Sequence, residues 1–139
     1  PEIGTIKALS MPYVFITSNN TREMSEALKR RCLHLFIPFP EPRLEREIIR
    51  VRVPDLSENL RNQLVSFIQQ VRKLDLKKLP SVSETIDWAK VLVLLHASKI
   101  EPGLIRDTLN VFLKFEEDIQ IAREHLNDML QKATRAALP

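Results

Sequence analysis

The chain has 139 residues, 44% of them hydrophobic and 28% charged, which is enough for one domain with a modest core or for two very small domains. Its 21 Lys and Arg exceed its 18 Asp and Glu by three, an excess too small to indicate a nucleic-acid partner by itself. Only two residues are glycine, which excludes a glycine-rich phosphate loop, a dinucleotide-binding fingerprint and a nucleophile elbow from these residues. No apolar run approaches the roughly 20 residues of a membrane span, no signal-peptide pattern is visible, and the single Cys32 fits a cytoplasmic location.

The first forty residues have the character of β-strands. Short apolar runs at 5–9, 13–17 and 33–37 predict strands, and the second run is aromatic and β-branched without alternation, as in a strand covered on both faces. Polar residues 18–21 predict a turn, and a short helix is expected from Met24 to Arg30. This order indicates part of an α/β layer. Because the chain opens inside this pattern and without a methionine, we expect it to be a fragment of a longer protein.

After the proline-rich segment the apolar residues take on a helical period. Proline suits the first position of a helix, so a first helix is expected from Pro42, with Leu44, Ile48 and Ile49 as apolar residues and Val51 as a further candidate. Ser57 is expected to cap a second, amphipathic helix. The apolar face of this second helix consists of Leu60, Leu64, Phe67, Ile68, Val71 and Leu74.

Three further helices are expected. Ser81 and Glu84 have the spacing of a capping box at the start of the third. This helix contains Val91–Leu95, which is apolar on all sides, so we expect it to be the central helix of a bundle. The fourth begins at Glu101 with Pro102 and the fifth near Glu116.

The predicted fold class is mainly α, with the end of an α/β sheet before a helical bundle. Residues 1–40 supply two or three strands and residues 41–139 the bundle, and the boundary lies in Pro38–Pro42. The charge excess lies around this junction: residues 22–52 contain eight basic and five acidic residues, whereas residues 53–139 contain twelve of each. A helical module that binds nucleic acid through a basic face is therefore not expected.

Two motifs in the first domain are candidates for chemistry. Asn19 follows a predicted buried strand, at the end where ligands bind in open α/β sheets, and its amide can orient a water or a phosphate oxygen. A turn or a helix cap is the alternative role, and position alone favours it. Arg30 and Arg31 close the short helix, where the helix dipole alone explains basic residues. Because Arg31 leads into a strand, it is also placed to reach a phosphate of a neighbouring subunit.

Other chemistry-bearing residues suggest no site. His34, His96 and His125 are scattered, and Cys32 has no local partner, so neither a metal site nor a Cys/His nucleophile is expected. Trp88 and the phenylalanines have the spacing of core residues rather than of a stacking platform.

Residues 13–33, YVFITSNNTREMSEALKRRCL, resemble the second half of an AAA+ ATPase module. The shared pattern is a strand ending in Thr-x-Asn, a short helix with Ala-Leu, an Arg before a strand, and a Pro-rich link to a helical lid. The Thr-Ser-Asn-Asn and Ala-Leu-Lys-Arg-Arg-Cys stretches are similar to those of the MoxR family, in the branch associated with carbon monoxide dehydrogenase maturation. The similarity continues through residues 80–88 and covers most of the chain.

This resemblance implies roles for the two motifs. Asn19 corresponds to the sensor-1 residue that positions the attacking water near the γ-phosphate of ATP. Arg31 corresponds to the arginine finger supplied to the neighbouring subunit, with Arg30 as the alternative. Residues 41–139 correspond to the AAA+ lid. The Walker A and B motifs are expected upstream of Pro1, so ATP and Mg²⁺ are cofactors expected of the full-length parent and not of this chain alone.

One position departs from the family pattern. Glu84 stands where many MoxR relatives have the sensor-2 arginine of the lid, and a carboxylate cannot pair with a phosphate. The nearest basic residue, Lys90, lies six positions further along and is expected to face elsewhere.

The leading hypothesis is the C-terminal part of a MoxR-type AAA+ ATPase that couples ATP hydrolysis to chaperone-like remodelling or maturation of metal-cofactor enzymes. The resemblance implies a ring, expected to be a hexamer, and a client metalloenzyme or a von Willebrand A-type protein as partner, with no nucleic acid. One alternative is a non-enzymatic helical protein-interaction module, and another is a DNA-linked AAA+ relative such as a helicase loader. A P-loop encoded upstream favours the ATPase, whereas a start codon near Pro1 favours the module.

Overall fold

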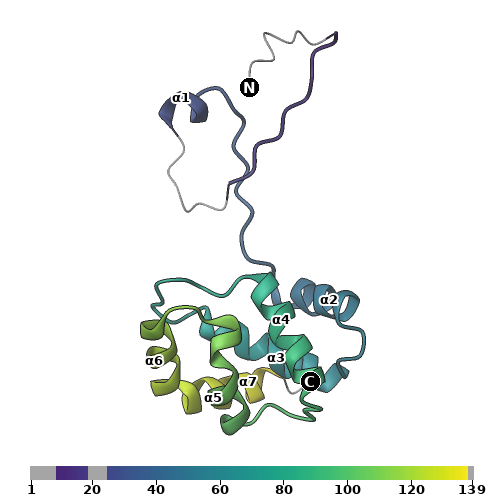
Figure 1. The fold of residues 1–139 in the computed structure, drawn as a ribbon, viewed down its shortest axis with the longest axis vertical. Coiled ribbons are helices and arrows are strands. Elements are labelled where there is room, and N and C mark those ends of the chain that lie inside the picture. Colours follow the sequence, from purple (N-terminus) through teal and green to yellow (C-terminus); the bar gives the residue numbers. More distant parts are fainter. Residues whose placement is uncertain (1–8, 19–24, 138–139) are drawn as a thin grey trace, which may run out of the picture. The chain divides into compact units, whose positions relative to one another are not determined.

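The computed structural model describes residues 9–18 and 25–137, and the chain divides into two compact units, Pro1–Ile37 and Pro38–Pro139 (Figure 1). We call these the N-terminal unit and the helical unit. The described residues are mainly helical, with these helices: α1 (Glu26–Lys29), α2 (Pro42–Arg52), α3 (Glu58–Val71), α4 (Val82–Leu94), α5 (Pro102–Phe112), α6 (Glu116–Glu124) and α7 (Leu126–Ala137). The expectation of a mainly α fold with a helical bundle is confirmed at this level. None of the described helices is long and apolar enough to cross a bilayer.

The predicted strands at 13–17 and 33–37 are not formed in this structure: both segments are irregular, and no strand occurs among the described residues. Their apolar side chains lie exposed: Tyr13 is 95% and Phe15 91% accessible, and Phe36 is 73% accessible. A strand exists only where a neighbouring strand takes up its backbone hydrogen bonds, and the described residues provide no such neighbour. Most of the predicted first strand, residues 5–8, lies outside the described residues.

The short helix of the N-terminal unit is α1, shorter than the predicted Met24–Arg30. It begins where the Ser25 hydroxyl accepts a hydrogen bond of 3.3 Å from the backbone N–H of Leu28. Four residues make about one turn, for which side-chain capping supplies a large share of the local order.

The helical unit follows the predicted periodicity in its capped helices. Pro42 occupies the first turn of α2, and the hydroxyl of Ser57 accepts a hydrogen bond from the Leu60 N–H at the start of α3. In α2, however, Leu44 is 56% exposed and the buried positions are Glu45 and Ile49. The predicted core face of α2 is therefore wrong for Leu44, because the helix turns a carboxylate inwards in its place.

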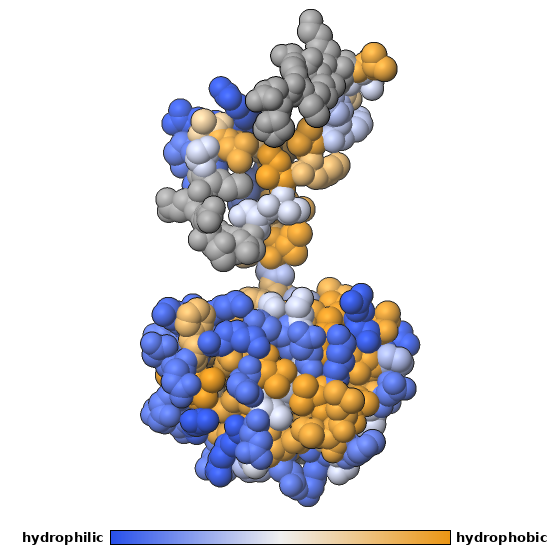
Figure 2. Space-filling model, in the orientation of Figure 1, coloured by the Kyte–Doolittle hydropathy of each residue, from blue (hydrophilic) through white to orange (hydrophobic). Residues whose placement is uncertain are grey.

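The central helix is α3, not α4 as predicted. Seven residues of α3 are buried, and this helix packs against α2, α4 and α7. Of the run Val91–Leu95, only Leu92 is fully buried, whereas Leu94 is 76% and Leu95 54% exposed. An apolar run is buried on all sides only if neighbours surround it, and the C-terminal end of α4 has them on one side only. Figure 2 shows hydrophobic side chains on the surface over this end of α4.

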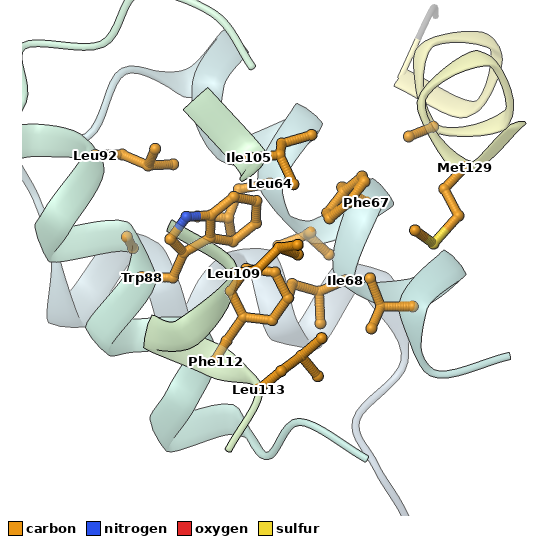
Figure 3. Packing of buried hydrophobic residues seen from close by; sticks show 14 of the residues in the cluster. Leu64, Phe67, Ile68, Trp88, Leu92, Ile105, Leu109, Phe112, Leu113 and Met129 are labelled. Atoms are coloured by element: carbon orange, nitrogen blue, oxygen red, sulfur yellow. The ribbon is translucent and has the colours of Figure 1, made fainter. Parts of the chain in front are cut away.

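Three aromatic rings form the centre of the core (Figure 3). Trp88 lies 4.6 Å from Phe112 and 5.6 Å from Phe67, measured between ring centroids, and all three side chains are buried. The indole N–H donates to the hydroxyl of Thr108 over 2.9 Å. The predicted packing role is thus confirmed for these rings, whose tilted contacts are of the favourable kind.

The predicted fifth helix is two helices. His125, with φ −95° and ψ 3°, separates α6 from α7. The apolar residues continue across this break: Ala122 of α6 and Leu126 and Met129 of α7 are buried. The period of apolar residues therefore predicts which side chains are buried, but not the break in the helix at His125.

Candidate functional site

The arginines predicted as finger residues lie at the C-terminal end of α1. The Arg30 N–H donates to the Glu26 carbonyl and the Arg31 N–H to the Leu28 carbonyl, each over 3.0 Å, so the backbone of both is fixed to the helix. Both side chains are exposed, and among the described residues no carboxylate pairs with either. Lys29, in contrast, pairs with Glu26 at 3.2 Å. Two exposed guanidinium groups on a fixed backbone are available to an anion from elsewhere.

The sensor-1 candidate Asn19 lies outside the described residues. The preceding segment 13–18 is described up to Ser18, whose side chain is exposed. The sensor-1 role of Asn19 therefore stays a prediction.

Glu84 has a local role in the helical unit. Its carboxylate accepts a hydrogen bond of 2.7 Å from the Ser81 backbone N–H, while the Ser81 hydroxyl accepts from the Glu84 N–H, which completes the predicted capping box. The other carboxylate oxygen accepts from Lys78 Nζ over 2.8 Å. Burial raises the pKa of Glu84, but the hydrogen bonds from Lys78 and Ser81 outweigh it and hold the pKa below its ordinary value.

Lys90, the basic residue considered in place of Glu84, lies on the surface of α4. Its side chain is 56% exposed and pairs with Asp87 at 3.5 Å. It is not directed at Glu84, as expected from the six-residue separation.

The most strongly built polar cluster of the helical unit centres on a buried ion pair. The carboxylate of Glu45, fully buried on α2, receives both terminal nitrogens of the Arg72 guanidinium at 2.8 Å. Gln69 donates to the same carboxylate over 2.8 Å and Thr85 over 3.2 Å. Every lone pair that the carboxylate presents to the protein thus has a partner, as a buried charge requires.

The same cluster attaches the proline-rich link to the bundle. Arg72 Nε donates to the Pro80 carbonyl over 2.9 Å, and its guanidinium lies 4.5 Å from the ring centroid of Phe39. The Gln69 amide also donates to the Pro40 carbonyl over 3.3 Å. This cluster therefore holds α2, α3, α4 and the link in one arrangement, and its closed hydrogen bonding leaves no group free for a ligand.

A second buried carboxylate organises the loop after α3. Asp118, in the first turn of α6, accepts from the backbone N–H groups of Lys77 and Lys78 over 2.7 and 3.1 Å. The Lys77 ammonium lies 4.6 Å from the ring centroid of Phe115. These contacts fix a loop and, like those of Glu45, are internal to the helical unit.

Sequence reasoning missed the Glu45–Arg72 pair. The partners are 27 residues apart, so no local spacing could show it. The one available signal was that Glu45 lies four residues before Ile49, on the face of α2 that enters the core. No group of three His, Cys, Asp or Glu side chains gathers around a common point within residues 9–18 and 25–137.

Comparisons with protein-family models, with curated proteins and with solved structures gave no match. The resemblance to AAA+ proteins therefore depends on the motifs in residues 13–33 and 80–88 alone.

Proposed function

We propose that this chain is the C-terminal part of a MoxR-type AAA+ ATPase, in which Asn19 and Arg31 act on ATP and the helical unit is the lid. ATP and Mg²⁺ would be held by Walker motifs upstream of Pro1, because the two glycines of this chain offer no phosphate loop. Hydrolysis would drive remodelling or maturation of a metal-cofactor enzyme. This last step follows from the resemblance only.

The observation that carries the proposal is the exposure of two apolar runs on either side of α1. Tyr13, Val14, Phe15 and Ile16 are 57% to 95% exposed, and Leu33, Leu35, Phe36 and Ile37 are 73% to 105% exposed. Proteins in water rarely leave apolar runs of this size uncovered. In an AAA+ core both runs would be inner strands, and the rest of the sheet would cover them.

The surroundings of Arg31 support the assigned role. An arginine finger must be held at its backbone, free at its guanidinium and directed out of its own subunit. Arg31 has a backbone fixed to α1 and an exposed side chain without an ion-pair partner among the described residues. Glu84 does not support a sensor-2 role, because capping and Lys78 occupy its carboxylate.

Arg31→Ala in the full-length parent tests the proposal. A finger acts in trans on the ATP of a neighbour, so its loss should lower turnover on the order of 10³-fold. A residue that only complements the helix dipole would change stability by about 0.3 to 1 kcal/mol and leave turnover intact. The measurement is steady-state ATPase activity, with Lys29→Ala on the same helix as the control, which should stay active.

Rings that mix two kinds of defective subunit test whether Arg31 acts on the ATP bound by a neighbouring subunit. Rings of Arg31→Ala subunits and rings of subunits lacking the P-loop lysine should each be inactive, and mixtures should recover activity where an intact Arg31 meets an intact ATP site. Full activity of the pure Arg31→Ala ring, or no recovery in verified mixed rings, would remove Arg31 from the site.

A non-enzymatic helical module is the second candidate, and the exposed Leu44 and Val51 on α2 favour it. The coding sequence before Pro1 distinguishes the two. A P-loop, G-x-x-x-x-G-K-[ST], within one domain length supports the ATPase, and its absence from the complete gene supports the module.

A further inference from the structure

A cavity of about 260 Å³ opens on the surface of the helical unit between α3 and α4. The loop before α3 and the first turn of α3 form one wall, and the C-terminal turn of α4 forms the other (Figure 1). The apolar residues that line it are Leu56, Leu60, Val93 and Ala97. The first two are buried and the last two half-buried, so the cavity reaches from the surface down to the core.

The apolar surface continues outside the cavity. Leu94 and Leu95 follow Val93 directly and are 76% and 54% exposed, and Figure 2 shows hydrophobic surface over this end of α4. The cavity is smaller than the roughly 300 to 1,000 Å³ of sites that enclose a small molecule, which suits one anchoring side chain better than a whole metabolite. An occupant that fills the cavity and also covers the two leucines is longer than its anchor, as a peptide segment is.

Asp55 determines which charge suits the occupant. This residue lines the cavity, its side chain is exposed, and no ion pair or hydrogen bond engages its carboxylate within residues 9–18 and 25–137. Ser57 and His96 also line the cavity, but the Ser57 hydroxyl already caps α3. A cationic group next to the apolar anchor is therefore the complement of this wall.

The other charges near the cavity offset one another. The positive end of the α3 dipole and the negative end of the α4 dipole both adjoin it, so their partial charges largely cancel. Arg52 and Glu58 are exposed on either side of Asp55 in the sequence, have opposite signs and do not line the cavity. The carboxylate of Asp55 therefore sets the sign of the charge at the cavity.

We propose that this cavity is the docking site for a segment of a partner protein in which a large apolar residue stands next to a lysine or arginine. The apolar side chain fills the cavity, the cation pairs with Asp55, and the adjoining part of the segment covers Leu94 and Leu95. All of these residues belong to the helical unit, so the proposal stands or fails independently of ATP hydrolysis and of Arg31.

Peptide titrations of the 139-residue chain, followed by heteronuclear NMR at about pH 8, where imidazole side chains are mostly neutral, test this site. The probe is acetyl-Gly-Phe-Lys-Gly-amide, and the control peptides have Glu in place of Lys or Ala in place of Phe. The probe should shift the backbone amide signals of Asp55, Leu56, His96 and Ala97 with a Kd on the order of 1 mM, as expected for one buried side chain and one exposed ion pair. Each control peptide should bind at least about threefold more weakly, and the difference between the Lys and Glu peptides should shrink in about 1 M NaCl.

Variants of the chain locate the binding. Ala97→Leu fills the cavity and should abolish the shifts, while it keeps the Ala97 N–H that donates to the Leu92 carbonyl. Asp55→Asn, at an exposed position, should weaken binding of the probe about two- to fivefold and remove the preference for Lys over Glu. Asp75→Asn is the matched control, since it removes the same charge from an exposed carboxylate beyond the other end of α3 and should bind like the parent chain.

Circular dichroism checks that each variant is folded, and Asp55→Asn decides the matter if Ala97→Leu is not. The proposal is overturned if the probe at about 10 mM, roughly ten times the expected Kd, leaves the signals of the lining residues unshifted. Equal affinity for the Lys and Glu peptides, or unchanged affinity of Asp55→Asn, overturns it as well. If the same signals shift when the chain alone is concentrated, the cavity belongs to a contact between copies and not to a partner segment.

Discussion

Glu45 is a carboxylate at a position where a helix facing the core usually has an aliphatic residue. Its burial removes most of its hydration, and the two Arg72 bonds, Gln69 and Thr85 replace it. Such a pair gives little net stability over an apolar pair of the same volume, but breaking it leaves a buried charge without a partner. Its contribution is therefore the fixed arrangement of three helices and the link.

Glu45→Gln should lower the free energy of unfolding by about 3 to 5 kcal/mol, because the Arg72 guanidinium loses its counter-charge in the interior. Urea unfolding followed by circular dichroism measures this. Glu47→Gln on the same helix breaks only the surface pair with Arg50 and should cost about 0.5 kcal/mol or less. Glu45→Met/Arg72→Met should cost less than either single change. A loss under about 1 kcal/mol for Glu45→Gln would mean that the pair is solvated.

The lowered pKa of Glu84 predicts that the stability of the fold depends on pH. Its pKa is held below 4.5 in the folded protein, so the charged form stabilises the fold above the unfolded-state pKa, and this contribution is lost as the pH falls through the lowered value. Glu84→Gln keeps an acceptor for the Ser81 N–H and removes the charge, so it should cost about 1 kcal/mol or less at pH 7 and nothing at low pH. Unfolding at a series of pH values measures the difference, which should shrink in a Lys78→Met background. An unchanged difference down to pH 2 would contradict the assignment.

At the scale of elements, the sequence predicts the features whose partners are close in the chain and misses those whose partners are distant. The caps at Ser57 and Ser81 were predictable because their partners lie three residues away. The strands expected at 13–17 and 33–37 do not form, because a strand needs neighbouring strands as hydrogen-bond partners and the described residues provide none. The choice of α4 as the central helix failed for the same reason: composition states how apolar a helix is, but not how many neighbours it has.

Helix α4 ends at a residue other than glycine in a left-handed conformation, a feature that the composition does not predict. His96 has a φ of 50°, in the left-handed region where glycine is usual. Its N–H donates to the Val93 carbonyl and the Ala97 N–H to the Leu92 carbonyl, each over 3.0 Å, which is the pattern of a Schellman motif. The helix therefore ends here despite the apolar run before it.

His96→Gly should raise the free energy of unfolding by about 0.5 to 1 kcal/mol. Glycine has no Cβ to oppose a positive φ, and this gain exceeds the greater freedom of glycine in the unfolded chain. His96→Ala is the control, since it removes the imidazole but keeps the Cβ, and should give no gain. Thermal and urea unfolding both measure the change; equal stability of the glycine and alanine variants would show that the backbone is unstrained.

At the scale of the whole molecule, the described core belongs to the helical unit alone. Its buried apolar residues run from Ile49 to Ala133, and the aromatic centre joins α3, α4 and α5. The candidate site, in contrast, lies in the N-terminal unit, where the motifs resemble AAA+ proteins but packing within the described residues is sparse.

Removing residues 1–37 should leave the free energy of unfolding within about 0.5 kcal/mol of that of the full chain, because the described core lies beyond them. The same truncation should strongly reduce the fluorescence of a dye that binds exposed apolar surface. Starting at residue 41, the boundary expected from the sequence, also deletes Pro38, Phe39 and Pro40. This should cost about 1 kcal/mol more than starting at 38, since Arg72 loses the Phe39 ring and Gln69 loses the Pro40 carbonyl. If the two truncated chains are equally stable, the link contributes nothing to the stability of the helical unit; if both are unfolded, the helical unit needs residues before 38.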